Sequence, residues 1–208
     1  MDKRSKLTLM VPIALLLGLI MVGVVHAGDH PANSMWIEPS EIDVSGMSVG
    51  DRFNVTVWLN VSVNCGAWQF LLIYNKQQLA VTKYGLTGTG GARSQFFEKC
   101  GSGTWGMVSY EDDHNATHKY IQIGESWKSG PWGIGAGSLA WIEFEIKTQP
   151  PFVCVLDIAN ADTYALAPDM SEIPLNVWNT PVVPEFHPLI LMIALIGTTA
   201  VCILLRKE

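Results

Sequence analysis

The sequence predicts an all-β sandwich of about nine short strands, with an apolar segment at each end of the chain. Apolar and polar residues alternate from residue 53 to residue 63, which is typical of a strand with one face in the core. Residues 67–74 are apolar at nearly every position, which indicates a strand covered on both faces. Further strand-like runs recur between glycine- and proline-rich turns, and no helical period interrupts them.

Residues 51–81 form the first part of this sandwich. The alternation places six apolar side chains on the inner face of the first strand, and Asn64-Cys65-Gly66 supplies the turn that follows. The inner residues are Phe53, Val55, Val57, Leu59, Val61 and Val63, and the outer ones are Asn54, Thr56, Trp58, Asn60 and Ser62.

The remaining strands are expected in order along the chain. Short edge strands flank Pro39, and a glycine-rich loop over residues 84–103 holds one apolar island at residues 95–97. Strands near residues 105–110 and 119–123 are joined by a polar hairpin tip. Alternation predicts a strand over residues 138–147, and two more are expected at 152–158 and 173–178.

Both ends of the chain are predicted to serve export and anchoring. Residues 1–27 carry three basic side chains, an apolar run and a small residue at Ala27, which is typical of a secretory signal peptide, although an uncleaved signal anchor is the alternative. Residues 189–205 are apolar and are followed by Arg206-Lys207, which predicts a transmembrane helix with its tail inside. Residues 28–183 are therefore expected outside the cell, anchored in the cytoplasmic membrane by one C-terminal span in residues 184–208.

Charge and cysteine content agree with an exported domain. The chain has 13 Lys and Arg against 19 Asp and Glu, which argues against a nucleic-acid partner. Of its 4 cysteines, Cys202 lies in the predicted span. The other three allow at most one intramolecular disulfide, for which Cys65 with Cys100 is preferred. Candidate glycosylation sequons begin at Asn54, Asn60 and Asn115.

The order of the motifs resembles a cohesin domain. Val49-Gly50-Asp51 precedes the alternating strand, and Gly66-Ala67-Trp68-Gln69-Phe70 opens the next one. A later segment, residues 135–144, and the closing Glu172-Ile173-Pro174-Leu175 are similar to corresponding parts of that family. The resemblance covers residues 36–180 but leaves residues 84–130 unmatched.

This resemblance implies a nine-stranded jelly roll, related to carbohydrate-binding modules, that holds a partner protein called a dockerin. It implies that Trp68, Phe70, Leu72 and Tyr74 are buried. The opposite face of the same strand would meet the partner through Ala67, Gln69, Leu71 and Ile73. Cohesins that bind dockerins often have polar side chains at the first two of these positions, and here only Gln69 is polar.

A second resemblance lies at the C-terminus. Pro184-Glu185-Phe186 directly before the apolar span is similar to the PEF-type sorting signal of archaeal surface proteins. Members of that class are thought to be cut near the motif by a membrane transpeptidase and re-anchored.

No pattern of catalytic residues is present, so the chain is expected not to be an enzyme and to need no cofactor. The segment over residues 111–118 holds three carboxylates and two histidines, but a solvated hairpin tip explains it better than a metal site. Glu143 and Glu145 share the outward face of one predicted strand, at a spacing that a glycosidase carboxylate pair could have. We interpret them instead as part of a solvent-exposed face.

Tryptophans suggest an alternative function, because aromatic faces stack on sugar rings. A surface carbohydrate-binding module would use Trp58 together with Trp105, Trp127 and Trp132, which lie beside glycines in predicted loops. A structural coat component without a specific ligand is a third possibility.

Overall fold

The computed structural model describes residues 30–100, 104–127 and 130–183. The predicted signal peptide, the sorting motif and the C-terminal span lie outside these residues. Within the described part of the chain, no helix has the length and hydropathy needed to cross a membrane. The fold described below belongs to the unit that begins at Pro31.

The first layer is a five-stranded sheet in the order β12-β1-β3-β8-β5. Its central strands are the long β3 (Arg52–Cys65) and β8 (Gly133–Ile146), which pair antiparallel along most of their length. The predicted alternation in β3 is confirmed from Val55 to Val61, where the inner residues are buried and the intervening ones are partly exposed. It is wrong for Val63, which is 47% exposed where the pairing with β8 becomes irregular. The other members are β1 (Ser34–Glu38), β5 (Leu79–Leu86) and β12 (Asn176–Trp178).

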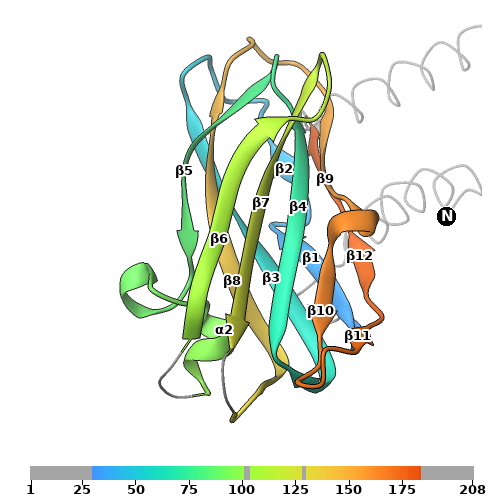
Figure 1. Ribbon diagram of the computed structural model, residues 1–208. Coiled ribbons are helices and arrows are strands. Elements are labelled where there is room, and N and C mark those ends of the chain that lie inside the picture. Colours follow the sequence, from blue (N-terminus) through green and yellow to red (C-terminus); the bar gives the residue numbers. More distant parts are fainter. Residues whose placement is uncertain (1–29, 101–103, 128–129, 184–208) are drawn as a thin grey trace, which may run out of the picture. The chain divides into compact units, whose positions relative to one another are not determined.

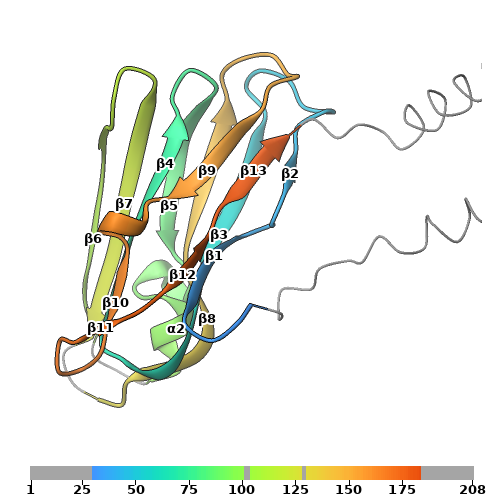
Figure 2. The ribbon, with the colours of Figure 1, turned by 90° about the vertical axis from the view of Figure 1, so that its right-hand side faces the viewer.

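The second layer is an eight-stranded sheet built around β4 (Ala67–Asn75). On one side β4 pairs along its whole length with β7 (His118–Trp127), which pairs in turn with β6 (Thr104–Asp113). On its other side β4 pairs with β9 (Cys154–Ile158) near one end and with β10 (Tyr164–Leu166) near the other. Figures 1 and 2 show the two layers facing each other. The smaller members are β2 (Ile42–Asp43), β11 (Glu172–Ile173) and β13 (Thr180–Val183).

The described residues form thirteen strand segments instead of the predicted nine. The expected last strand over residues 173–178 shows why the count differs. It is divided into β11 and β12, which belong to different sheets, and Pro174 follows directly after β11. Proline has no N–H to donate to a ladder, so pairing stops there and the chain passes to the other layer.

The apolar island at residues 95–97 is a short helix instead of an irregular loop. Helix α2 (Gln95–Glu98) begins at Ser94, whose hydroxyl accepts a hydrogen bond from the N–H of Phe97. Phe96 and Phe97 are buried in the core between the sheets, and Phe97 stacks on Trp127 with ring centroids 5.5 Å apart. This helix lies within residues 84–130, which the cohesin resemblance leaves unmatched, and it fills part of the core.

The predicted disulfide between Cys65 and Cys100 is not formed in the structure. Cys65, Cys100 and Cys154 are free and buried. The thiol of Cys65 instead donates a hydrogen bond to the carbonyl of Ala67 at 3.1 Å. Burial raises the pKa of the Cys65 thiol to about 12, so this sulfur is held as a neutral thiol.

A carboxyl group lies inside the sandwich on β7. Glu125 points inward, opposite Trp68 of β4, and its Oε2 atom accepts a hydrogen bond from the N–H of Ser94 at 3.0 Å. Its Oε1 atom has no hydrogen-bond partner among the described residues. Burial raises the pKa of Glu125 above its ordinary value, because a charged carboxylate is poorly solvated there.

We expect Glu125 to make the protein less stable as the pH rises through and above the ordinary Glu pKa of about 4.3. The folded state then binds more protons at this site than the unfolded state, so the free energy of unfolding falls with pH, by about 1.4 kcal/mol per unit of pKa difference. Glutamine does not titrate, so the Glu125→Gln variant should lose this part of the pH dependence of the free energy of unfolding. Urea unfolding at about pH 4 and about pH 7 measures it as a difference from the parent protein.

The matched control for this measurement is Glu41→Gln, because Glu41 is exposed. It should leave the pH dependence of the parent protein unchanged. An identical pH dependence in Glu125→Gln and in the parent would show that the buried carboxyl is not linked to folding.

Candidate functional site

The two faces of β4 have different roles in the structure. Its inward residues belong to the core between the sheets, as the cohesin resemblance implies for Trp68, Phe70, Leu72 and Tyr74. Ala67, Gln69, Leu71 and Ile73 point to the opposite side, away from that core. The candidate binding residues therefore share one surface, which lies over the middle of the second sheet.

Strand register extends this surface onto the neighbouring strands. Residues that pair directly across an antiparallel ladder point to the same side of the sheet. The surface, called the outer face below, consists of the outward residues of β6, β7, β4, β9 and β10. Three rows cross it: Val108, Gly124, Gln69 and Tyr164; then Tyr110, Gln122 and Leu71; then Asp112, Tyr120, Ile73 and Asp157.

Leu71 occupies the floor of the outer face. It lies between β7 and the short turn η2 (Asn160–Asp162), which connects β9 to β10. The N–H of Leu71 donates to Thr163 Oγ1 at 3.3 Å, and its carbonyl accepts from the N–H of Ala159 at 2.9 Å. Only 8% of Leu71 is exposed, so its apolar character is explained mainly by packing beneath the surface.

The exposed apolar area lies on the flanking strands, which the sequence interpretation did not include. Val108 and Tyr110 on β6 are 59% and 43% exposed, and Val155 on β9 is 48% exposed. Large exposed apolar side chains gathered on one sheet face are typical of a protein-binding surface. No sequence signal located them, because alternation at residues 108–112 would place the apolar Val108 and Tyr110 on the inner face, whereas the structure turns them outward.

Hydrogen bonds hold the polar and aromatic side chains of the outer face in place. Tyr164 donates to Gln69 Oε1 at 3.2 Å, and Gln69 Nε2 donates to the carbonyl of Asp162 at 3.2 Å. Tyr120 donates to the hydroxyl of Tyr110 at 3.4 Å, and the two rings meet edge to face with centroids 5.7 Å apart. Side chains fixed in this way lose little conformational entropy when a partner binds.

Two hollows indent the outer face, one near each end. The smaller one, of about 160 Å³, lies over Gly124 and is bordered by Val108, Gln69 and Tyr164. A side chain at Gly124 would begin 3.1 Å from the carbonyl oxygen of Trp68 and would occupy this hollow. The larger one, of about 570 Å³, lies at the other end and is lined by Ile73, His114, His118, Val153, Val155 and Asp157, among others.

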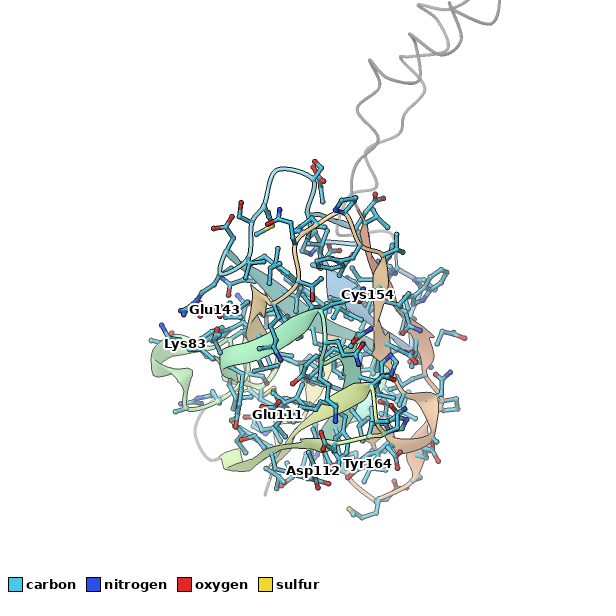
Figure 3. The ribbon with its side chains drawn as sticks, turned by 90° about the horizontal axis from the view of Figure 1, so that it is seen from above. Lys83, Glu111, Asp112, Glu143, Cys154 and Tyr164 are labelled. Atoms are coloured by element: carbon cyan, nitrogen blue, oxygen red, sulfur yellow. The ribbon has the colours of Figure 1, made fainter. Side chains whose placement is uncertain are left out.

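The charges of the outer face have one sign. Asp112 and Asp157 end the third row, and Asp162 lies on the η2 turn beside Gln69. From residue 107 onward, no outward residue of the described parts of these strands is Lys or Arg. Figure 3 shows Asp112 and Tyr164 on the side of the second sheet that faces away from Glu143.

The hairpin between β6 and β7 is a polar tip, as predicted, and the N–H groups of His114 and Asn115 both donate to the carbonyl of His118. His114 also contacts the ring of Tyr120 edge on. The described residues contain no group of His, Cys, Asp or Glu arranged to hold a metal ion.

The tryptophans proposed for sugar binding do not form one platform. Trp58 lies on the outside of the five-stranded sheet and stacks on Trp36 with centroids 6.1 Å apart. Trp127 is buried against Phe97, and Trp132 packs against the core. The side chain of Trp105 lies outside the described residues. Two of the four are therefore explained by packing.

The three sequons differ in accessibility. Asn54 is exposed on the outside of β3, and Asn115 is exposed at the hairpin tip. Asn60 is partly buried and donates a hydrogen bond to the carbonyl of Pro31 at 3.3 Å. Glycosylation at these positions stays a prediction.

Comparison with known proteins identifies the fold through solved structures alone, since no family model and no curated protein matches the chain. A non-cellulosomal cohesin from the archaeon Archaeoglobus fulgidus has 14% identity and a TM-score of 0.51, over 74% of this chain and 92% of that one. A cohesin from Acetivibrio cellulolyticus, solved in complex with a dockerin, has 13% identity and a TM-score of 0.52, over 74% and 100%. A type I cohesin–dockerin complex from Clostridium thermocellum gives 15% identity and a TM-score of 0.52, also over 74% and 100%. The chain therefore has a cohesin-like fold.

Proposed function

We propose that the protein is a non-catalytic binding and scaffolding module of the cell surface that holds a partner protein through the outer face. The observation that carries this proposal is the group of exposed apolar and aromatic side chains there, held by hydrogen bonds on a rigid sheet. Cohesin neighbours solved in complex with dockerins support a dockerin-like partner.

The physical argument rests on the form of this surface. Tyr110, Tyr120 and Tyr164 supply aromatic area with polar tips, and residues of this type dominate the energetics of many interfaces. Leu71 and Ile73 form an apolar floor between them. The hollow over Gly124 can receive a protruding partner side chain, because a glycine there leaves the space open.

The location outside the cell is part of the proposal. It is supported by the signal-like residues 1–27, by the apolar run at residues 189–205 and by the sequons of the domain between them. The Pro184-Glu185-Phe186 motif supports sorting and re-anchoring of the kind found in archaeal surface proteins. A nine-stranded jelly roll, with the short edge segments counted as extensions, is the topology that we propose for the domain.

We expect Tyr110→Ala to reduce capture of the partner by at least about tenfold, because truncating an exposed tyrosine that anchors an interface typically costs about 2 kcal/mol or more. Full-length parent and variant proteins would be immobilised and exposed to the surface proteins of the source cells. Bound proteins are then quantified by mass spectrometry. Tyr110 is exposed, so circular dichroism should show an unchanged fold.

Trp178→Ala is the matched control, because Trp178 is an exposed aromatic residue on the five-stranded sheet. It should leave partner capture unchanged. Equal loss in both variants, or no loss in either, would contradict a partner site on the outer face.

The carbohydrate-binding alternative makes a separate prediction that the same proteins can test. Polysaccharide binding that is lost in Trp58→Ala while Tyr110→Ala remains unaffected would favour the alternative. The stacking of Trp58 on Trp36 argues against it, since one ring face of Trp58 is already covered.

A further inference from the structure

We propose that the partner segment seated on the outer face carries lysine or arginine side chains around an apolar centre. This inference rests on the proposed function and adds the chemistry of the partner to it. It follows from the position, the sign and the pairing of the charged groups that surround the tyrosines.

Three carboxylates from three different elements flank the apolar floor. Asp112 of β6 is directly opposite Tyr120, and Asp157 of β9 is directly opposite Ile73. Asp162 is on the η2 turn, and its backbone carbonyl holds the side chain of Gln69. An apolar segment seated over Leu71 would therefore have acidic groups on both sides.

These carboxylates affect the pKa of Tyr120, which lies on β7 near the centre of the outer face. The hydrogen bond to Tyr110 and partial desolvation raise the pKa of Tyr120. The negative charges of Asp112 and Asp162 raise it further, which places both carboxylates within electrostatic reach of the Tyr120 hydroxyl. Two of the three carboxylates thus act on the same central group.

Among the described residues, none of these three carboxylates forms an ion pair. Asp157 accepts a hydrogen bond from the neutral amide of Asn179, and Asp112 accepts one from the N–H of Asp113. The direct ion pairs of the nearest lysines go to other carboxylates, since Lys119 pairs with Glu111 and Lys76 with Asp113. Glu111 raises the pKa of Lys119 most, and the charges of Asp113 and Asp112 raise it further, so Lys119 offsets part of the charge of Asp112 without an ion pair. His114 and His118 are the titratable bases at the hairpin end of the face.

The energetic consequence concerns which partner can dock. Binding removes water from the apolar floor and its surroundings, so an acidic partner segment would bring like charges together in a less polar medium. A basic segment gains attraction at the same positions and associates faster at low salt. Charge complementarity therefore selects a basic rim on the partner.

The test uses the full-length protein and a phage-displayed library of random helical peptides. Clones are kept if they bind the parent protein and fail to bind Tyr110→Ala, which restricts them to the outer face. We expect these clones to be enriched in Lys and Arg over Asp and Glu. Synthetic copies should bind a variant with Asp112→Asn, Asp157→Asn and Asp162→Asn about tenfold more weakly at low salt, and this ratio should shrink at high salt.

The control variant carries the same change in net charge outside the outer face, with Glu41→Gln in the loop before β2 and with Glu143→Gln and Glu145→Gln on β8. It should bind the selected peptides as the parent does. Selected peptides without an excess of Lys and Arg, or with equal affinity for the Asp→Asn variant, would overturn the basic-partner inference and leave the binding face intact. A selection in which no clone depends on Tyr110 would instead overturn the proposed function itself.

Discussion

Replacing Phe96 by alanine is expected to lower the free energy of unfolding by about 3–5 kcal/mol, the range for removing a large buried aromatic side chain. Phe96 is 2% exposed and packs between the two sheets from helix α2. Its ring lies against two glycines of β8. A Cβ atom at Gly133 would come within 2.3 Å of the Phe96 ring, and one at Gly137 would come within 2.8 Å of the Phe96 Cα atom.

Urea unfolding followed by tryptophan fluorescence measures this loss, and a second pair of variants tests its cause. Gly133→Ala should be strongly destabilising in the parent protein, because the added methyl group meets the ring. The same substitution should be much better tolerated in a Phe96→Ala background, where the ring is gone. Such non-additivity is expected only for residues in direct contact.

Additive effects of these two substitutions would show that α2 does not pack on β8 in this way. A loss below about 1 kcal/mol for Phe96→Ala would show that Phe96 is not part of the core. Val108→Ala serves as the control, because Val108 is exposed and its truncation should change the stability by no more than about 0.5 kcal/mol.

Leu71→Asp is expected to destabilise the folded protein by about 3 kcal/mol or more. The substitution removes a buried apolar side chain and introduces a carboxylate at a site that is only 8% exposed. Thermal and urea unfolding of the purified full-length variant measure the effect.

Leu71→Met is the matched control, because it preserves apolar character and volume and should cost less than about 1.5 kcal/mol. A fully stable Leu71→Asp variant would show that Leu71 is an accessible contact residue instead of part of the floor. For this reason Tyr110, and not Leu71, is the residue whose substitution tests partner binding without disturbing the fold.

The local sequence pattern was sufficient to predict the strands in which apolar residues recur with a period of two. The alternation predicted the inner and outer faces of β3 as far as Val61, and the hairpin of β6 and β7 was located from two strand-like runs around a polar tip. The failures lie where the outcome depends on distant partners. Helix α2 is one turn long, so no period could reveal it, and its position is set by the two glycines about 40 residues later on β8.

The candidate site shows the same division. The cohesin resemblance assigned Ala67, Gln69, Leu71 and Ile73 to one side of one strand, and the structure agrees on that side. Neither the resemblance nor the sequence pattern could show that Leu71 is covered or that Val108, Tyr110 and Val155 carry the exposed area. Burial depends on which strands lie on either side, and the sequence does not specify this. The predicted Cys65–Cys100 disulfide failed for a related reason, since turn-like sequence contexts do not specify how two thiols are oriented.

The sequence by itself determined the class of the protein: an all-β sandwich with a net acidic charge and no catalytic motif, between two apolar terminal segments. These properties depend on composition and on a period of two residues, both of which are local. Only the tertiary structure decided that three tyrosines, two hollows and three aspartates meet around β4. They come from β6, β7, η2, β9 and β10, and the register between strands that are distant in sequence brings them onto one face.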